Sequence, residues 1–277
     1  MAKRHFAGKV VVVTGAGSGI GRSTALLFGR LGASVHTADL DGASAEAVAA
    51  EIEAAGGRAS AHTVDVSDPA AVEALAERVF EVEGAVDILH NNAGVGHAGA
   101  VDETTLGEWQ RVLGVNLMGV IHGIHHFVPR MLQQGRQGHI VNTASLAGLV
   151  AAAEMGPYCT SKHAVVGLSE SLNAELQPRG IRVSAVCPGF IDTPITASAH
   201  LEPGLAEHRE RIQRFYRRFG SSPDVVAKAV VDTVRRNRLI RTVPRHHVAL
   251  NWALRRISPR AAQSFARLST RLISGRG

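Results

Sequence analysis

Short apolar runs alternate with stretches of helical periodicity along most of the chain. The runs are rich in Val, Ile and Ala, which is typical of strands buried on both faces. Between them, apolar residues return every three or four positions, as on one side of a helix. The pattern predicts strands over residues 9–14, 34–39, 59–64, 86–90, 138–144, 181–187 and 239–243. It predicts helices over residues 19–31, 43–55, 105–134, 158–176 and 223–236, with another that opens at Pro69 behind the N-cap Asp68.

Alternating strands and helices imply right-handed βαβ units and a parallel sheet. We therefore expect an α/β fold, a single doubly wound domain with a parallel sheet of about seven strands. Its body covers residues 1–244, and residues 245–277 form an extension of the same domain. Residues 190–220 separate the sixth strand from the next helix, and an insertion of that length predicts a lid over a substrate site.

The composition is ordinary for a soluble globular enzyme, with 45% hydrophobic and 19% charged residues. Cys159 and Cys187 give no disulfide framework, and both are expected to be small buried side chains. The first residues lack the apolar segment of a secretory signal, and no run approaches the roughly 20 apolar residues of a membrane span. These features favour a cytoplasmic location.

The net charge of +6 is unevenly distributed. Residues 233–277 hold eleven arginines and no Asp or Glu, so the rest of the chain carries a net charge of −5. No recognition motif or interleaved aromatic residues accompany these arginines, so we expect no nucleic-acid binding.

The tail also carries an amphipathic pattern over residues 259–273. Its apolar stripe consists of Ala261, Phe265, Leu268 and Leu272, with Arg260, Arg267 and Arg271 beside it. Such a helix is expected to pack on the acidic body or on a neighbouring subunit, because a long apolar stripe is rarely left exposed. Peripheral contact with an anionic membrane is the alternative.

Tyr158 and Lys162 are four residues apart in an expected helix, so they share one face. A nearby ammonium favours the phenolate and lowers a tyrosine pKa, which would make the pair a general acid and base. Ser145 follows the strand over residues 138–144, at the edge of the sheet where α/β proteins bind ligands. Its hydroxyl can hold a substrate oxygen that Tyr158 protonates.

A glycine-rich turn, Thr14–Gly21, joins the first strand to the first helix. Its spacing is T-G-x-x-x-G-x-G, and its glycines let the backbone approach a pyrophosphate at a helix N-terminus. Together with Ser145, Tyr158 and Lys162, this turn resembles the short-chain dehydrogenase/reductase family over roughly residues 8–245. The resemblance implies a Rossmann-type fold, a nicotinamide cofactor and four catalytic residues: Asn116, Ser145, Tyr158 and Lys162. Asn116 lies within the expected helix 105–134, where a local break would bind a water that links Lys162 to solvent.

The resemblance also implies the cofactor-binding residues: Gly15, Ser18, Gly19, Ile20, Gly21, Asp39, Leu40, Asp65, Val66, Asn92, Ala93, Gly94, Tyr158, Lys162, Pro188, Gly189, Ile191 and Thr193. Asp39 ends the second strand, where a carboxylate accepts hydrogen bonds from ribose hydroxyls and repels the 2′-phosphate of NADP. Neither Ser18 nor Leu40 is basic, so we expect NAD as the cofactor, although Arg22 is a cation close in sequence.

The expected substrate-binding residues are mostly apolar: Ser145, Leu146, Leu149, Val150, Met155 and Tyr158, flanked by Val95 and His97. They favour a secondary alcohol on an apolar body, such as a sterol, a terpenoid or a lipid, in reversible exchange with its ketone. A sugar or an acyl-thioester carbonyl is the alternative substrate. A cofactor-binding sensor without catalysis is the alternative function.

The resemblance further implies a homotetramer or homodimer, built through the helices around residues 118–134 and 158–176. Three histidines, His122, His125 and His126, share helical spacing in the first of these helices. No carboxylate or cysteine joins them in the sequence, so we expect packing or an interface there and no metal site.

Overall fold

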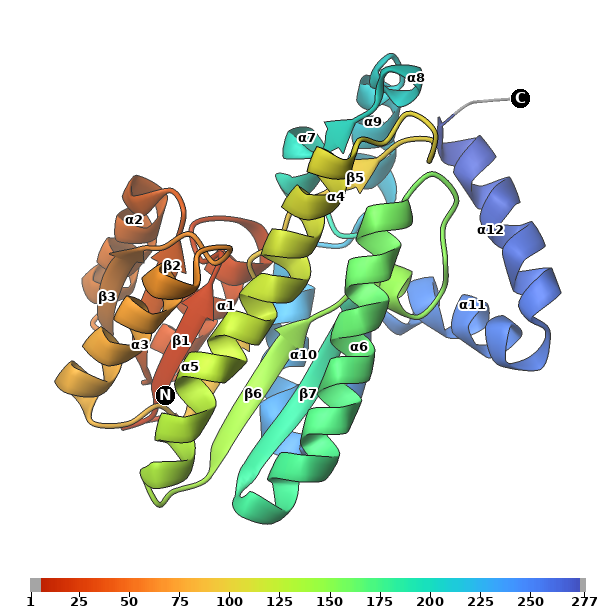
Figure 1. Cartoon of the computed structure of the whole chain (residues 1–277). Coiled ribbons are helices and arrows are strands. Elements are labelled where there is room, and N and C mark those ends of the chain that lie inside the picture. The colour runs from red at the N-terminus through yellow and green to blue at the C-terminus, as the bar shows by residue number, and fades with distance from the viewer. Residues whose placement is uncertain (1–5, 275–277) are drawn as a thin grey trace.

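The computed structural model describes residues 6–274, except for several side chains in the C-terminal helices. Seven parallel strands form one sheet in the order β3-β2-β1-β4-β6-β7-β9 (Figure 1). The strands are β1 Val10–Thr14, β2 Ser34–Asp39, β3 Arg58–Thr63, β4 Ile88–Asn91, β6 Gly138–Thr143, β7 Ile181–Pro188 and β9 Ile240–Val243. The doubly wound parallel sheet predicted from the sequence is therefore confirmed.

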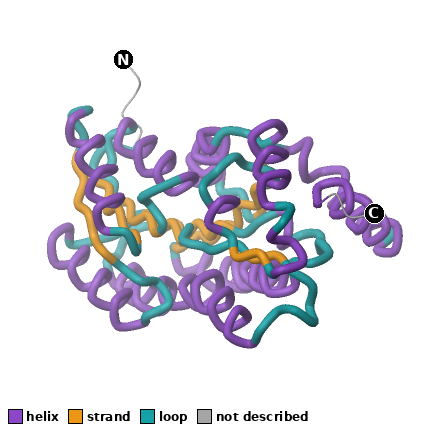
Figure 2. Tube along the Cα trace, turned by 90° about the horizontal axis from the view of Figure 1, so that it is seen from above, coloured by secondary structure: helices purple, strands orange, loops and turns teal. Residues whose placement is uncertain are grey.

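Helices cover both faces of this sheet (Figure 2). Val11 and Val13 of β1 contribute to the hydrophobic core on the side of α1, α2 and α10, whereas Val10 and Val12 contribute to the core beside α3 and α5. This alternation follows from the two-residue period of a strand. The helices are α1 Gly19–Arg30, α2 Gly42–Ala54, α3 Pro69–Glu83, α4 Leu106–Leu113, α5 Gly119–Gln133, α6 Gly156–Leu176 and α10 Pro223–Arg236.

The helix expected over residues 105–134 is interrupted, as predicted, near Asn116. A π-helical turn, Gly114–Met118, separates α4 from α5. By length and composition, the combined stretch Leu106–Gln133 is apolar enough to cross a membrane, which the sequence reading overlooked. Phe127 and Met131 of this stretch are fully buried in the core, so we interpret it as a core helix.

The expected lid, residues 190–220, folds into short elements above the carboxyl edge of the sheet. These are α7 Ile195–Ser198, β8 His200–Leu201, α8 Pro203–Ala206 and α9 Arg209–Phe219. Strand β8 pairs in parallel with β5, His97–Ala98, and forms a second small sheet. This pairing was missed because strands of two residues carry no readable alternation.

The C-terminal extension forms α11 Arg245–Ile257 and α12 Pro259–Ser274, so the predicted tail helix is confirmed. Val248 is fully buried in a core cluster that also includes Val165 and Val166 of α6, and Trp252 packs against the same cluster. Figure 1 shows α11 and α12 beside the main body, beyond α6. Leu268 is 55% exposed, and the side chains of Phe265 and Leu272 lie outside the described residues. The packing expected for the helix over residues 259–273 is therefore seen only in part: Ala262 of α12 is buried, whereas Leu268 of its apolar stripe faces solvent.

Candidate functional site

The carboxyl ends of β1, β4 and β6 are held together by two threonines and one asparagine. Thr14 Oγ1 accepts hydrogen bonds from the backbone N–H groups of Asn92 and Ala93, at 3.0 and 3.1 Å. Asn92 Nδ2 donates back to the Thr14 carbonyl at 3.1 Å, and Thr143 Oγ1 donates to Asn92 Oδ1 at 3.2 Å. Asn92 therefore holds together the carboxyl ends of these three strands, where the site lies. The sequence analysis assigns no contact to Thr14 or Thr143, although Thr14 opens the glycine-rich motif and Thr143 lies two residues before Ser145.

The glycine-rich turn leaves no room for side chains, as a dinucleotide cradle requires. A Cβ on Gly21 would lie 1.9 Å from the Gly15 carbonyl oxygen, and one on Gly15 would lie 2.8 Å from the Ala93 Cα. Gly15 and Gly19 also have positive φ angles of 63° and 51°, which L side chains rarely adopt. Ser18 is the N-cap of α1, but its side chain makes no capping hydrogen bond, so the first N–H groups of this helix remain available to a ligand.

Two further segments come close to this turn. A Cβ on Gly19 would lie 3.3 Å from Thr193 Cβ, which brings the segment after β7 over the glycine-rich turn. Ile191 is 5% exposed and its side chain packs in the core, so the side chain presents no surface to a ligand. Gly189 packs against His247 of α11, where a Cβ would lie 2.6 Å away. The tail therefore supports the Pro188-Gly189 turn.

Asp39 lies at the end of β2 beside the glycine-rich turn. Its Oδ2 accepts a hydrogen bond from the Gly17 N–H at 2.8 Å, and its Oδ1 accepts one from the Asp41 N–H at 3.1 Å. A carboxylate has about four acceptor positions, so further hydrogen bonds remain possible. Leu40 is 70% exposed, and Arg22 forms an ion pair with Glu51 at 2.5 Å. The geometry fits a ligand with hydroxyl groups at this position.

Asp65 and Val66 follow β3. Asp65 is exposed, and its Oδ1 accepts hydrogen bonds from the N–H and the hydroxyl of Ser67, at 2.9 and 2.7 Å. Val66 is buried, and its carbonyl accepts a hydrogen bond from His122 Nδ1 at 2.9 Å. Asp68 accepts a hydrogen bond from the Ala70 N–H and caps α3, as predicted.

Asn116 and Lys162 converge beside Gly94. A Cβ on Gly94 would lie 3.1 Å from Asn116 Oδ1 and 3.6 Å from Lys162 Nζ. Asn116 is fully buried in the π-helical turn, where Oδ1 accepts from the Val95 N–H at 2.8 Å and Nδ2 donates to the Val95 carbonyl at 3.0 Å. Nδ2 also lies 3.3 Å from Ser161 Oγ, so this amide ties the interrupted helix to α6.

Lys162 is buried without a carboxylate. Its side chain is 3% exposed, and Nζ donates a hydrogen bond to the Thr143 carbonyl at 2.9 Å. Burial lowers the pKa of Lys162 to about 8, because the ammonium loses its hydration. The lysine can therefore change its protonation state within reach of neutral pH.

Tyr158 lies on the same face of α6, one turn before Lys162. Burial raises its pKa above the ordinary value of 10.0, and a hydrogen bond with the Ser145 hydroxyl lowers it part of the way. The sequence-based expectation that Lys162 lowers the pKa of Tyr158 is therefore wrong for the protein without a bound cofactor. The ammonium is directed to the Thr143 carbonyl and lies 5.8 Å from the centroid of the Tyr158 ring. The effect of the Ser145 hydroxyl on this pKa shows that the two side chains lie close to each other, so one substrate oxygen could reach both.

The expected substrate wall is only partly assembled. Leu149 and Val150 are 5% and 9% exposed and pack in the core against Val165 and Val248, so they present little surface to a substrate. Leu146 and Met155 are half-buried. The turn that carries these residues follows Ser145, which caps it by accepting a hydrogen bond from the Ala147 N–H at 3.1 Å.

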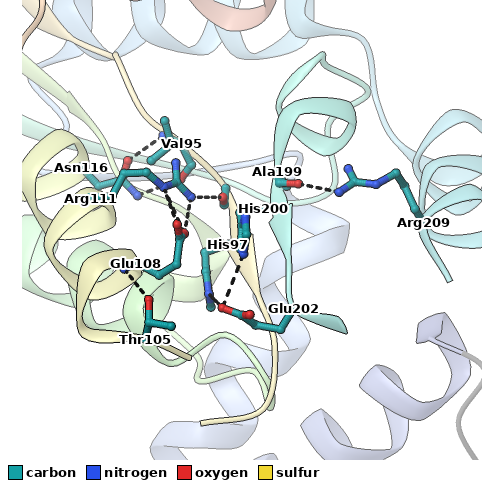
Figure 3. A network of polar contacts seen from close by, with 11 residues as sticks. Val95, His97, Thr105, Glu108, Arg111, Asn116, Ala199, His200, Glu202 and Arg209 are labelled. Carbon is teal, nitrogen blue, oxygen red and sulfur yellow. Dashed lines mark hydrogen bonds and ion pairs between the residues drawn. The ribbon is translucent and has the colours of Figure 1, made fainter. Parts of the chain in front are cut away.

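His97, expected in the same wall, instead fastens the lid. Its Nε2 lies 3.1 Å from Glu202 Oε1, and His200 Nε2 lies 3.6 Å from the same oxygen (Figure 3). Glu202 is 5% exposed and His97 is 1% exposed. A buried carboxylate needs polar partners, and the His97 imidazole serves as one for Glu202. His97 therefore contacts the lid and does not line the substrate site.

The lid also brings a second tyrosine to the site, which sequence reasoning missed. Tyr216 of α9 packs edge-to-face with Phe190 at a centroid distance of 5.6 Å, and Phe190 packs with Phe215 at 5.2 Å. Burial raises the pKa of Tyr216, and the nearby Tyr158 phenol adds to this effect. Both tyrosines of the chain therefore lie within electrostatic range of each other. The signal in the sequence was an aromatic cluster within a chain that has only 4% aromatic residues.

The three histidines of α5 do not form a metal centre. His122 bonds to the Val66 carbonyl, and His125 packs edge-on against His126 at 4.8 Å. Among residues 6–274, wherever side chains are described, no group of three or more His, Cys, Asp or Glu is placed to hold a metal ion. Cys159 and Cys187 are buried free thiols, as predicted.

Comparison with known proteins agrees with this geometry. Residues 9–203 match the family described as short chain dehydrogenase. A probable oxidoreductase, EphD of Mycobacterium tuberculosis, is 43% identical over 270 residues, which cover 95% of this chain and 45% of EphD. The chain thus spans about half the length of this relative. Because the match covers 95% of this chain, it includes at least part of residues 245–277.

Two further proteins are similar over the body. The cyclohexanol dehydrogenase of Acinetobacter sp. is 41% identical over 193 residues, which cover 69% of this chain and 76% of that enzyme. The structure of a short-chain dehydrogenase/reductase from Burkholderia phymatum in complex with NAD has a TM-score of 0.87 and 35% identity, and covers 93% of this chain and 96% of that one. Other solved structures of this fold contain NADH or NADP. The chain therefore belongs to the short-chain dehydrogenase/reductase family of oxidoreductases, which act on CH–OH groups with a nicotinamide cofactor.

Proposed function

We propose that the chain transfers hydride reversibly between an apolar secondary alcohol and NAD. The observation that carries this proposal is the convergence of four side chains at the carboxyl edge of β4 and β6. Tyr158 contacts Ser145, while Lys162 and Asn116 meet at Gly94, next to the glycine-rich turn. A cofactor-binding sensor without catalysis would use Tyr158 and Lys162 for cofactor contacts at most, and would need neither Ser145 nor Asn116.

The chain's own residues supply the proton chemistry. In the oxidative direction, Tyr158 takes the hydroxyl proton at Oη while Ser145 holds the substrate oxygen. Lys162, whose Nζ donates to the Thr143 carbonyl and lies beside Gly94, would hold the ribose of the nicotinamide. Asn116 keeps the helix open at the π-helical turn, where a water can pass the proton on. The chemistry that NAD supplies when bound is acceptance of the hydride.

Gly15, Ser18, Gly19, Ile20 and Gly21 would hold the pyrophosphate through backbone N–H groups. The remaining cofactor contacts would come from Asp39, Leu40, Asp65, Val66, Asn92, Ala93, Gly94, Tyr158, Lys162, Pro188, Gly189, Ile191 and Thr193. Asp39 supports NAD over NADP, because its carboxylate would repel a 2′-phosphate. The ion pair between Arg22 and Glu51 adds support for NAD. Arg22 is the cation near the glycine-rich turn that could bind a 2′-phosphate, and Glu51 already neutralises it.

The proposed substrate is an alicyclic or lipid-like secondary alcohol. The half-buried Leu146 and Met155 and the lid aromatics Phe190 and Tyr216 offer an apolar surface around Tyr158. The similarity to cyclohexanol dehydrogenase supports the same class of substrate. Residues 190–220 would act as the lid, held at its base by the contact between His97 and Glu202.

We also propose a cytoplasmic homotetramer or homodimer joined through α5 and α6. A cavity of about 480 Å³ between these helices is lined by apolar side chains together with the charged Glu175 and Arg179, a mixed surface that a second copy would cover. Light scattering at micromolar concentration tests the assembly, and a monomer would refute it. The exposure of Leu268 on α12 leaves peripheral membrane contact as a lesser proposal.

A panel of substrates tests the function. Cyclohexanol, a hydroxysteroid, a sugar alcohol and a 3-hydroxyacyl thioester are each incubated with NAD or NADP, and NADH or NADPH absorbance is followed. We expect turnover with the first two and NAD. Preference for the sugar alcohol or the thioester would show that the substrate is not an apolar alcohol. Absence of turnover with every substrate, despite NADH binding, would favour a cofactor-binding sensor without catalysis.

A further inference from the structure

A cavity of about 480 Å³ opens at the outer edge of the sheet, between β9 and α11. Arg238 and Ile240 line it from the start of β9, and Trp252 and Arg256 line it from α11. In the sheet order, β9 is four positions from β1, about 19 Å away at 4.8 Å per strand. The cavity is therefore separate from the glycine-rich turn.

Positive charge in this cavity exceeds the negative charge beside it. Four arginines line it: Arg238, Arg241, Arg245 and Arg256. Arg238 and Arg241 share one carboxylate, Asp232, at 3.6 Å each, and Arg236 contacts the same carboxylate at 2.5 Å. In the part of the chain that the structure describes, no ion pair joins Arg245 or Arg256 to a carboxylate.

One nitrogen is buried in each of two guanidinium groups. The Nε atoms of Arg238 and Arg241 are buried and make no hydrogen bond, and the Arg238 Nε lies 3.6 Å from Asp232 Oδ2. A buried donor without a partner is costly, and a charged one more so. Burial lowers the pKa of Arg241, Asp232 raises it, and the neighbouring arginines 238, 245 and 236 lower it further. A bound anion would relieve both the missing hydrogen bonds and the crowding of like charges.

The side chains that line the cavity suit a phosphate group. Arg256 stacks on Trp252 at 4.3 Å from the ring centroid, which fixes the plane of its guanidinium. Planar guanidinium groups bind phosphate oxygens in pairs, and several such groups can surround a tetrahedral anion. Ile240 and Trp252 leave an apolar wall for whatever group carries the phosphate.

We infer that this cavity, which is not part of the hydride-transfer site, binds a phosphate group. The same chemistry is offered by a soluble phosphate monoester and by a phospholipid headgroup. Binding would also order α11, and Arg255 of that helix donates a hydrogen bond to the Leu149 carbonyl in the turn after Ser145. An occupied cavity would thus stabilise the tail against the turn that borders the catalytic residues.

Titration calorimetry of the full chain with inorganic phosphate tests the inference, in the presence of saturating NADH to occupy the glycine-rich turn. The test variant is Arg241→Gln with Arg256→Gln. The control is Arg260→Gln with Arg267→Gln, which removes the same charge from exposed positions on α12. We expect saturable binding that weakens about tenfold or more in the test variant and less than about twofold in the control.

Absence of saturable binding up to about 10 mM phosphate would overturn the inference. An equal loss in both variants would also overturn it, because net charge alone would then explain the effect. If the test variant fails to fold, Arg241→Lys with Arg256→Lys keeps the charge but loses the planar donors, and several-fold weaker binding is expected.

Co-sedimentation with vesicles separates the two sources of phosphate. Phosphatidylcholine vesicles with and without phosphatidic acid are compared, with free phosphate as competitor. Pelleting that requires phosphatidic acid and is reversed by phosphate identifies a lipid headgroup. Phosphate binding without pelleting identifies a soluble ligand.

Discussion

Replacing Lys162 by Met should change the stability of the protein in a pH-dependent way. Lys162 is buried, and its pKa falls from 10.5 to about 8 in the folded chain. The folded chain therefore binds fewer protons than the unfolded chain between pH 8 and 10.5. Because stability rises with pH wherever the unfolded state binds more protons, the cost of the charged lysine is complete below pH 8 and disappears toward pH 10.5.

The size of this effect follows from the two pKa values. Each pH unit between them corresponds to about 1.4 kcal/mol, so the charged lysine costs about 3 kcal/mol at neutral pH. Met has a similar length and carries no charge, so the variant avoids this cost. It also loses the hydrogen bond to the Thr143 carbonyl, worth about 1 to 3 kcal/mol, but this loss is nearly independent of pH.

Urea unfolding of both proteins from pH 7 to 10.5, without nicotinamide, measures the difference. We expect the free energy of unfolding of the variant, relative to the unmodified chain, to fall by about 3 kcal/mol across this range. The exposed Lys228 provides the control, since Lys228→Met removes a lysine from the surface of α10. A difference that stays flat from pH 7 to 10.5 would refute the argument that Lys162 is desolvated.

Three further outcomes are expected. The unmodified enzyme should prefer NAD over NADP by tenfold or more in kcat/KM, about 1.4 kcal/mol. Asp39→Ser with Leu40→Arg should narrow or invert this preference. Equal use of both cofactors by the unmodified enzyme would contradict the role of Asp39. Gly21→Ala should weaken NADH binding about tenfold or more by fluorescence titration, because its Cβ would lie 1.9 Å from the Gly15 oxygen, whereas Gly167→Ala in the open middle of α6 should not. Truncation after Pro244 should lower the free energy of unfolding by about 3 kcal/mol or more, since it uncovers the surface that Val248 buries; an unchanged denaturation midpoint would show that the tail does not support the body.

Regular elements could be predicted because their signals are local. Strand β2 and helix α10 were predicted with the bounds that the structure shows, Ser34–Asp39 and Pro223–Arg236. In β2 five of six residues are buried, and in α10 a Ser-Pro start and a left-handed Asn237 mark the ends. The sequence predicted a break near Asn116 but not a π-helical turn. Asparagine is a poor helix former, and this does not say which geometry replaces the α-helix.

The site was less accessible to sequence reasoning where contacts join distant segments. His97 was expected beside the substrate, but its partner Glu202 lies 105 residues further along the chain. Lys162 was expected to act on Tyr158, but a carbonyl of β6 competes for the same ammonium. The eleven arginines of residues 233–277 can be counted in the sequence, whereas the convergence of four of them around one cavity depends on how β9 and α11 pack.

The central claim, that Tyr158 is the proton carrier, is tested most directly by comparing the two tyrosines of the chain. Tyr158→Phe and Tyr216→Phe each remove one hydroxyl and keep the ring, so a change in packing is matched between them. With NAD and the alcohol that gives the highest turnover, we expect kcat to fall by about 100-fold or more for Tyr158→Phe and by less than about tenfold for Tyr216→Phe, with NADH binding unchanged in both. Retention of most of the turnover by Tyr158→Phe would contradict the claim, and loss of turnover in Tyr216→Phe alone would move the proton carrier to the lid.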